Sequence, residues 1–222
     1  MNIIFHILII CIVLFILNIQ YKYINQVHNS TYEINQINNP DKTTFENIIE
    51  SKNPVVFINI LKNLDLSTFD LDNLKKKEQL ELKIDLTEHF KYYLIPLCIK
   101  YNFMLNKNNK KSYTPIIKQT NYRYLLAQIK GVKKILLFNP KQEKFLYPNK
   151  SRTESRVNFW EMEQRKKFPL FKKSKYIELI VQNNQMVFIP YKWWYTIYDV
   201  SDNISISSVS ESVFSYFLKN KK

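Results

Sequence analysis

Residues 124–149, YLLAQIKGVKKILLFNPKQEKFLYPN, contain the pattern that decides the fold. The first half alternates between the two faces of a predicted strand, with one face holding Tyr124, Leu126 and Gln128 and the other Leu125, Ala127 and Ile129. Gly131, the single glycine of the 222 residues, then supplies a tight turn, since a residue without Cβ adopts left-handed backbone at little cost. The run 134–138 returns as a second strand, so the stretch predicts a hairpin.

Further short strands are predicted on both sides of this hairpin. Downstream, β-branched and aromatic runs separated by turn-forming residues predict strands over 176–181, 186–189, 193–198 and 204–209. Upstream, Thr43 or Thr44 can cap a helix that ends at Glu50, and a strand over 54–60 follows. Two series of short strands joined by brief turns predict a sandwich or a jelly roll with flanking helices.

Three less regular segments carry predictions of their own. Asp85 and Glu88 have the spacing of a capping box for a helix that stops near Pro96. The run 106–111, NKNNKK, is predicted to be a loop in which asparagine adopts left-handed backbone. Asn158 is three residues before Glu161 and can cap a short helix ahead of the basic stretch 165–175.

Two segments resemble a known family. Residues 124–149 are similar to the core signature of the cupin-like JmjC hydroxylases, most closely to the asparaginyl hydroxylase that inhibits the hypoxia-inducible factor. Residues 167–197, KFPLFKKSKYIELIVQNNQMVFIPYKWWYTI, resemble a later segment of the same family, with its paired tryptophans in order. The resemblance implies a mainly β fold, the double-stranded β-helix or jelly roll. It also implies Fe(II) and 2-oxoglutarate chemistry on proteins.

The metal-binding motif of that family is degenerate in this chain. The family's His-x-Asp falls on Lys118, Gln119 and Thr120, and its second histidine falls on Tyr195. An ammonium has no lone pair to donate, threonine is a weak neutral donor, and a phenol with a pKa near 10 rarely ligates iron. We therefore expect no Fe(II) and interpret the domain as a non-catalytic pseudoenzyme that acts in binding or scaffolding. The alternative is an active 2-oxoglutarate oxygenase with non-standard ligands.

The resemblance also places a cosubstrate lysine on Lys133. One interpretation is that Lys133 binds 2-oxoglutarate or another small carboxylate, and the other is that it is an ordinary hairpin lysine. Lys118 could add a second cation to such an anion site. Alternatively, Lys118 points to solvent while Tyr195, Tyr124 and Trp194 fill the former metal cavity.

Composition excludes several other classes of site. Three histidines and two cysteines are too few for a Cys/His zinc site or a disulfide framework, and one glycine excludes glycine-rich phosphate loops. The chain has 33 basic and 19 acidic residues, a net charge of +14. Because the lysines are scattered and no nucleic-acid-binding motif is present, we predict no specific nucleic-acid partner. A protein partner is expected but not identified.

The N-terminal residues are apolar. The run 3–19, IIFHILIICIVLFILNI, predicts an uncleaved single-pass membrane anchor over 1–20, with a polar tether over 21–42 and the cupin-like domain over 43–222. The alternatives are a cleaved signal peptide, although no basic residue precedes the run, and a buried core helix. Lys22, the basic residue next to the run, favours a domain on the cytosolic side.

Overall fold

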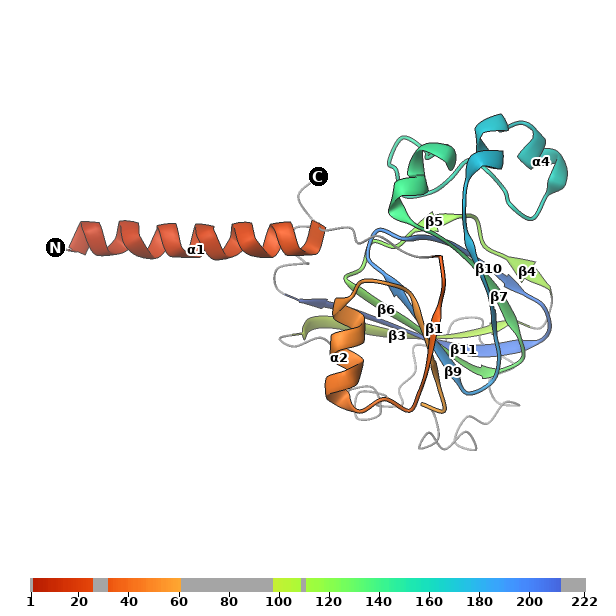
Figure 1. The fold of residues 1–222 in the computed structure, drawn as a ribbon, viewed down its shortest axis with the longest axis horizontal. Coiled ribbons are helices and arrows are strands. Elements are labelled where there is room, and N and C mark those ends of the chain that lie inside the picture. Colours follow the sequence, from red (N-terminus) through yellow and green to blue (C-terminus); the bar gives the residue numbers. More distant parts are fainter. Residues whose placement is uncertain (1, 26–31, 61–97, 109–110, 213–222) are drawn as a thin grey trace.

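A computed structural model describes most of the chain, and Figure 1 shows its arrangement. The described residues are 2–25, 32–60, 98–108 and 111–212. The helix predicted to run from Asp85 to near Pro96 lies outside them.

Two β-sheets form the body of the domain (Figure 1). The larger sheet contains, in order across it, β1 (Asn35–Asn38), β2 (Val55–Ile58), β9 (Gln185–Pro190), β6 (Arg123–Lys130), β11 (Asn203–Ser212) and β3 (Cys98–Asn108). The smaller sheet contains β4 (Ser112–Tyr113), β10 (Trp194–Asp199), β7 (Lys133–Phe138) and β8 (Ile177–Val181), and β5 (Ile117–Lys118) also pairs with β10. The chain crosses between the sheets from β6 to β7, from β8 to β9, and again on each side of β10. This arrangement confirms the predicted jelly roll.

Short helices cover the outer faces of both sheets. α2 (Lys42–Glu50) packs Phe45 and Ile49 into an apolar cluster on the larger sheet. Outside the smaller sheet lie the short elements η4 (Pro140–Phe145), α4 (Met162–Lys166) and η5 (Pro169–Lys173), of which η4 and η5 are 3-10 helices (Figure 1). The predicted mainly β fold with flanking helices is therefore confirmed.

Strand β6, the turn at Gly131 and strand β7 form where the sequence predicts them, but the two strands do not pair as a hairpin. β6 pairs with β9 and β11 in the larger sheet, whereas β7 pairs with β8 and β10 in the smaller one. Tyr124 and Leu126 point into the cluster between the two sheets, whereas Leu125 and Ala127 point into the cluster beneath α2. This is the alternation that the sequence predicts. Gly131 has φ +83°, and a Cβ there would lie 2.2 Å from the backbone oxygen of Asp202. Only glycine fits this turn without displacing the neighbouring chain.

The structure corrects two local predictions. The cap of α2 is Asp41 rather than Thr43 or Thr44, because the Asp41 carboxylate accepts a 2.9 Å hydrogen bond from the Thr44 backbone N–H. The run 106–111 is not wholly a loop, since β3 continues through Asn108 and pairs with β11. Cross-strand pairing overrides the loop composition of these asparagines.

The predicted division of the N-terminal residues also changes. Residues 35–38 are not part of a polar tether but form β1, which pairs in parallel with β2 at the edge of the larger sheet. The preceding helix, α1 (Asn2–Asn25), extends five residues past the predicted boundary at residue 20.

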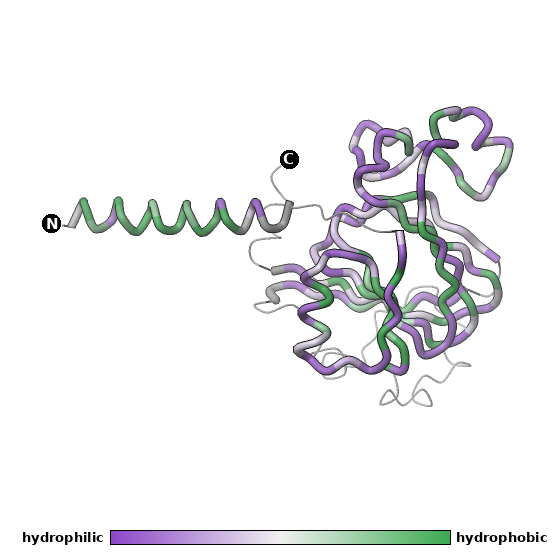
Figure 2. The backbone as a smooth tube through the Cα atoms, viewed as in Figure 1, coloured by the Kyte–Doolittle hydropathy of each residue, from purple (hydrophilic) through white to green (hydrophobic). Residues whose placement is uncertain are grey.

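Helix α1 is apolar along most of its length, as Figure 2 shows. Its described large apolar side chains are exposed, from Ile4 through Ile19. Among the described residues, however, no helix combines the length and the apolar character that a membrane span requires. The predicted membrane anchor is therefore not supported.

Candidate functional site

Strand β10 organises the candidate site, because its side chains alternate between the two faces of the smaller sheet. Tyr195 and Ile197 belong to the apolar interior between the sheets, whereas Trp194 belongs to the cluster on the outer face. β10 pairs with β7 along one edge and with β4 and β5 along the other. The register of these pairings decides which of the predicted site residues meet.

Tyr195 lies inside the jelly roll, with 7% of its surface exposed. Its ring stacks on Tyr124 of β6, with ring centroids 5.7 Å apart and planes inclined by 26°. The Tyr124 hydroxyl lies 3.2 Å from the hydroxyl of Ser207 on β11. Burial raises the pKa of both tyrosine hydroxyls, so both phenols are neutral at physiological pH.

Lys118 lies on the opposite face of the sheet from Tyr195. In the pairing of β5 with β10, Lys118 is opposite Trp194, and Ile117 is opposite Tyr195. Directly opposed residues share a face, so Ile117 packs against the interior and Lys118 lies outside. The Lys118 Nζ is 5.3 Å from the centroid of the Trp194 ring. Lys118 therefore does not face the interior, where it was predicted to contact an anion. Trp194 likewise does not fill the interior position of the former metal site.

The charge of Lys118 is balanced by a carboxylate from η4. Its Nζ lies 2.7 Å from Oε2 of Glu143, and the Arg152 guanidinium lies 2.5 Å from the other oxygen of the same carboxylate. Burial opposes ionisation of Glu143, but the hydrogen bonds from Lys118 and Arg152 outweigh it, so the pKa of Glu143 lies below its ordinary value.

Thr120, the third residue at the family's metal-ligand positions, follows β5 and is half-buried.

Lys133 is buried in a polar network that joins the two sheets. Its Nζ donates to Oδ1 of Asp199 at 2.5 Å and to Oδ1 of Asn203 at 2.7 Å. The second oxygen of Asp199 accepts from Asn108 at 2.5 Å and from Ser112 at 2.9 Å. Burial lowers the pKa of Lys133, and the Asp199 carboxylate opposes that shift.

The structure does not bring the two predicted cations together. Lys133 is opposite Asp199 on β10, and Lys118 is opposite Trp194, five positions earlier on the same strand. At about 3.4 Å per residue, these two positions are about 17 Å apart along the strand. Lys118 also lies outside the sheet, whereas Lys133 is buried next to Asp199. They form two separate ion pairs rather than one anion site.

Comparison with protein families identifies the fold that carries these residues. A family model described as a cupin-like domain matches residues 70–209, more than half of the 222-residue chain. The chain belongs to the cupin-like domain family. The match spans most of the jelly roll, including β6, β7 and β10, and it confirms the resemblance that residues 124–149 and 167–197 indicate.

Curated relatives of this cupin-like domain carry JmjC or demethylase names. The JmjC domain-containing protein D of Dictyostelium discoideum is 35% identical over 100 residues, which are 44% of this chain and 22% of that protein. The arginine-specific demethylase JMJ20 of Arabidopsis thaliana is 29% identical over 111 residues, 50% of this chain and 24% of that protein. The lysine-specific demethylase 8 of Danio rerio is 33% identical over 84 residues, 37% of this chain and 21% of that protein. The matched region thus spans about a quarter or less of these relatives.

The residues of this cupin-like domain do not fit a facial iron site at the predicted position. Such a site needs two imidazoles and a carboxylate that face one cavity. Tyr195 offers a buried neutral phenol instead, and Lys118 faces away from the interior. Among the described residues, no group of three His, Cys, Asp or Glu side chains could hold a metal ion. His89, with Asp85 and Glu88 beside it, lies outside the described residues.

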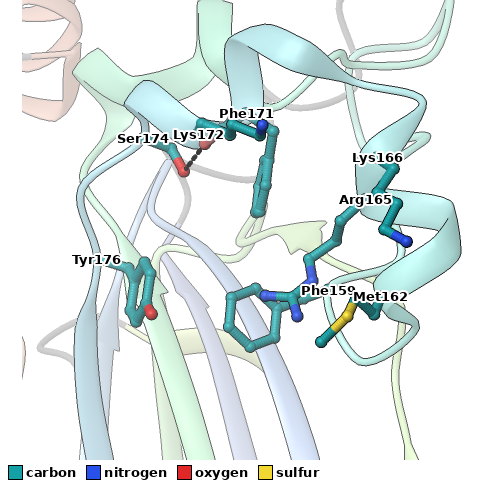
Figure 3. A pocket seen from close by; sticks show the side chains of 8 residues that line it. All are labelled: Phe159, Met162, Arg165, Lys166, Phe171, Lys172, Ser174 and Tyr176. Carbon is teal, nitrogen blue, oxygen red and sulfur yellow. Dashed lines mark hydrogen bonds between the residues drawn. The ribbon is translucent and has the colours of Figure 1, made fainter.

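A cavity that the sequence analysis did not assign lies outside the cupin-like jelly roll. Figure 3 shows its lining, which comes from α4, η5 and the segments next to them: Phe159, Met162, Arg165, Lys166, Phe171, Lys172, Ser174 and Tyr176. The basic stretch 165–175 carries no site prediction from the sequence. The alternation of phenylalanine with basic residues in that stretch is the signal that could have indicated the cavity.

Proposed function

We propose that this cupin-like domain is a non-catalytic binding protein rather than an iron-dependent oxygenase. The observation that carries the proposal is the stacked pair of Tyr195 and Tyr124 inside the jelly roll. Tyr195 occupies the position at which the family resemblance expects a metal-binding histidine. A buried phenol with a raised pKa is neutral, so it supplies no anionic oxygen to a metal.

The surroundings of Lys118 and Lys133 support the same proposal. Lys118 is engaged by Glu143 on the outer face. Lys133 is engaged by Asp199 and Asn203, so a carboxylate ligand such as 2-oxoglutarate would have to displace Asp199 from a buried ion pair. Exchanging the Asp199 carboxylate for that of a ligand gives little net binding free energy, because each carboxylate makes a similar ion pair with the same buried ammonium. The network therefore favours a structural role for Lys133.

The alternative function is that of an active 2-oxoglutarate oxygenase, and the demethylase names of two relatives favour it. In that case iron would need ligands other than Lys118, Thr120 and Tyr195. Succinate distinguishes the two functions, because a 2-oxoglutarate oxygenase releases it and a non-catalytic binding protein does not.

Succinate formation tests the proposal directly. The full chain is incubated with Fe(II), ascorbate and 2-oxoglutarate, and succinate is quantified against a reaction without protein. We expect no succinate above that background. Succinate formed by the unaltered chain above this background would contradict the proposal.

A further inference from the structure

The outer cavity has a volume of about 250 Å³ and is separate from the interior of the jelly roll. α4 and η5 form its rim, and the aromatic side chains beneath them rest on the smaller sheet (Figure 3). Phe138 of β7 contacts both Phe171 and Tyr176, with ring centroids 6.1 and 5.6 Å away. The cavity is therefore built on the outer face of the sheet whose inner face carries Tyr195.

One side of the cavity is aromatic. The ring of Phe159 meets Tyr176 edge to face, with centroids 5.4 Å apart and planes inclined by 78°. It meets Phe171 in a similar way at 6.1 Å and 69°. A contact between two aromatic rings contributes about 0.5–1.5 kcal/mol beyond area burial, so a further ring packed against these residues would gain contacts of that size. This wall therefore suits an aromatic group.

Basic side chains from α4 and η5 also line the cavity. The Arg165 guanidinium lies 4.9 Å from the centroid of the Phe159 ring, and its Nε is buried with no hydrogen-bond partner among the described residues. Lys166 is paired with Glu163 at 2.6 Å. Lys172 is exposed and has no carboxylate partner within the described part of the chain. Arg165 and Lys172 thus retain positive charge that an anion can balance.

The Ser174 hydroxyl does not donate to that anion. The Ser174 hydroxyl donates a 2.7 Å hydrogen bond to the Phe171 backbone oxygen, which Figure 3 marks with a dashed line. Its proton is therefore used at the end of η5, and the guanidinium and the ammonium supply the positive charge that an anion needs. A guanidinium recognises the two oxygens of a carboxylate through paired hydrogen bonds.

We propose that this cavity binds a small aromatic carboxylate, with the ring against Phe159, Phe171 and Tyr176 and the carboxylate at Arg165 and Lys172. The volume lies just below the range of about 300–1,000 Å³ that holds drug-sized ligands, so the ligand has about one ring and a short acidic arm. The inference deepens the proposed binding function by naming a ligand class, and in that sense rests on it.

Isothermal titration of the full chain with phenylacetate tests the assignment. Acetate retains the charge without the ring, and phenylacetamide retains the ring without the charge. We expect saturable phenylacetate binding with a Kd of about 1 mM or tighter, and at least about tenfold weaker binding of both comparison compounds. Absence of phenylacetate binding at about 10 mM, or equal binding of phenylacetamide, would overturn the proposal.

Two neighbouring lysines provide a matched pair of variants. Lys172→Met removes a cation that lines the cavity, whereas Lys173→Met removes an exposed lysine of the same element that does not line it. We expect Lys172→Met to weaken phenylacetate binding about fivefold and Lys173→Met to leave it unchanged. Arg165→Met should weaken it at least about tenfold, with circular dichroism confirming that the variant is folded. Equal effects of the two lysine variants would overturn the assignment.

Failure of this inference can be distinguished from failure of the proposed function. Phenylacetate binding that responds to Lys172→Met supports the cavity even if the chain forms succinate. A chain that forms no succinate and binds no phenylacetate refutes the cavity and leaves the binding function without this ligand.

Discussion

The two faces of the smaller sheet differ in the side chains that they present. On the inner face, Tyr195 and Tyr124 stack at the position where the family resemblance expects a metal-binding histidine. On the outer face, Phe159, Phe171 and Tyr176 line a cavity, and Arg165 lies over the Phe159 ring. The inner face presents a buried neutral pair of tyrosines, whereas the outer cavity combines aromatic rings with Arg165 and Lys172. Arg165 and Lys172, the cations of the proposed ligand site, therefore lie outside the jelly roll.

Consecutive residues of strand β10 lie on opposite faces of the smaller sheet. Tyr195 and Trp194 are consecutive, yet they lie in different apolar clusters. Because side chains alternate along a strand, a shift of one residue in the pairing of β5 with β10 would exchange Lys118 and Ile117 between these environments. The ion pair of Lys118 with Glu143 and the packing of Ile117 both oppose such a shift.

The largest effect is expected from truncating the interior aromatic pair. Tyr195→Ala should lower the free energy of unfolding by about 4 kcal/mol, because it leaves a cavity and removes the stacked partner of Tyr124. Tyr176→Ala, in the partly exposed wall of the outer cavity, should cost about 1 kcal/mol. Urea denaturation measures both. Equal losses would show that the interior is not the more tightly packed of the two regions.

The buried ion pair between the sheets should show the next largest effect. Lys133→Met should cost about 3 kcal/mol, since Asp199 would remain buried without its cation. The double variant Lys133→Met/Asp199→Leu should recover part of that loss, because it removes both charges. Urea denaturation of the single and double variants provides the comparison. A double variant less stable than Lys133→Met would contradict this account of the network.

The outer ion pair should contribute less, and in a pH-dependent way. Glu143→Gln should cost about 1 kcal/mol at neutral pH, because Lys118 and Arg152 lose their shared carboxylate. The native pKa of Glu143 lies below its ordinary value of 4.5, so the unfolded state binds more protons between these two pKa values. The stabilisation is therefore complete above 4.5 and is lost as the pH falls through the native pKa.

Urea denaturation as a function of pH measures this effect. The difference between the unaltered chain and Glu143→Gln should narrow below 4.5 and vanish in strong acid. A difference that stays constant from neutral pH to strong acid would show that Glu143 contributes by packing rather than by charge.

The smallest effect on stability is expected at the rim of the outer cavity. Lys172→Met should change the free energy of unfolding by no more than about 0.5 kcal/mol, because the side chain is exposed and has no carboxylate partner within the described residues. Thermal unfolding checks this result. A larger loss would mean that weakened ligand binding in this variant reflects a damaged fold.

The two strands on either side of Gly131 could be predicted from the sequence because their information is local, whereas their pairing as a hairpin was wrong, because they belong to different sheets. Alternation sets the two faces of β6, and the single glycine marks a turn whose positive φ and close contact with Asp202 exclude a side chain. The other predicted strands of the second half were found for the same reason, since each is a short apolar run between turn-forming residues.

The residue pairs of the site could not be predicted in this way, because long-range contacts create them. Lys133 meets Asp199, which is 66 residues away in the sequence. The face on which Lys118 lies depends on a pairing register that the sequence of β5 alone does not specify. The outer cavity requires α4 and η5 to fold back over the sheet, and the stretch 165–175 indicates only its charge and aromatic content.

The amount of Fe(II) bound per chain tests the central claim most directly. The full chain is reconstituted anaerobically with Fe(II), desalted, and analysed for iron by inductively coupled plasma mass spectrometry. The full chain matters for this measurement because it includes His89, which lies outside the described residues. We predict no stoichiometric iron, since Tyr195 and Lys118 supply no ligands to the interior. One iron per chain would contradict the account.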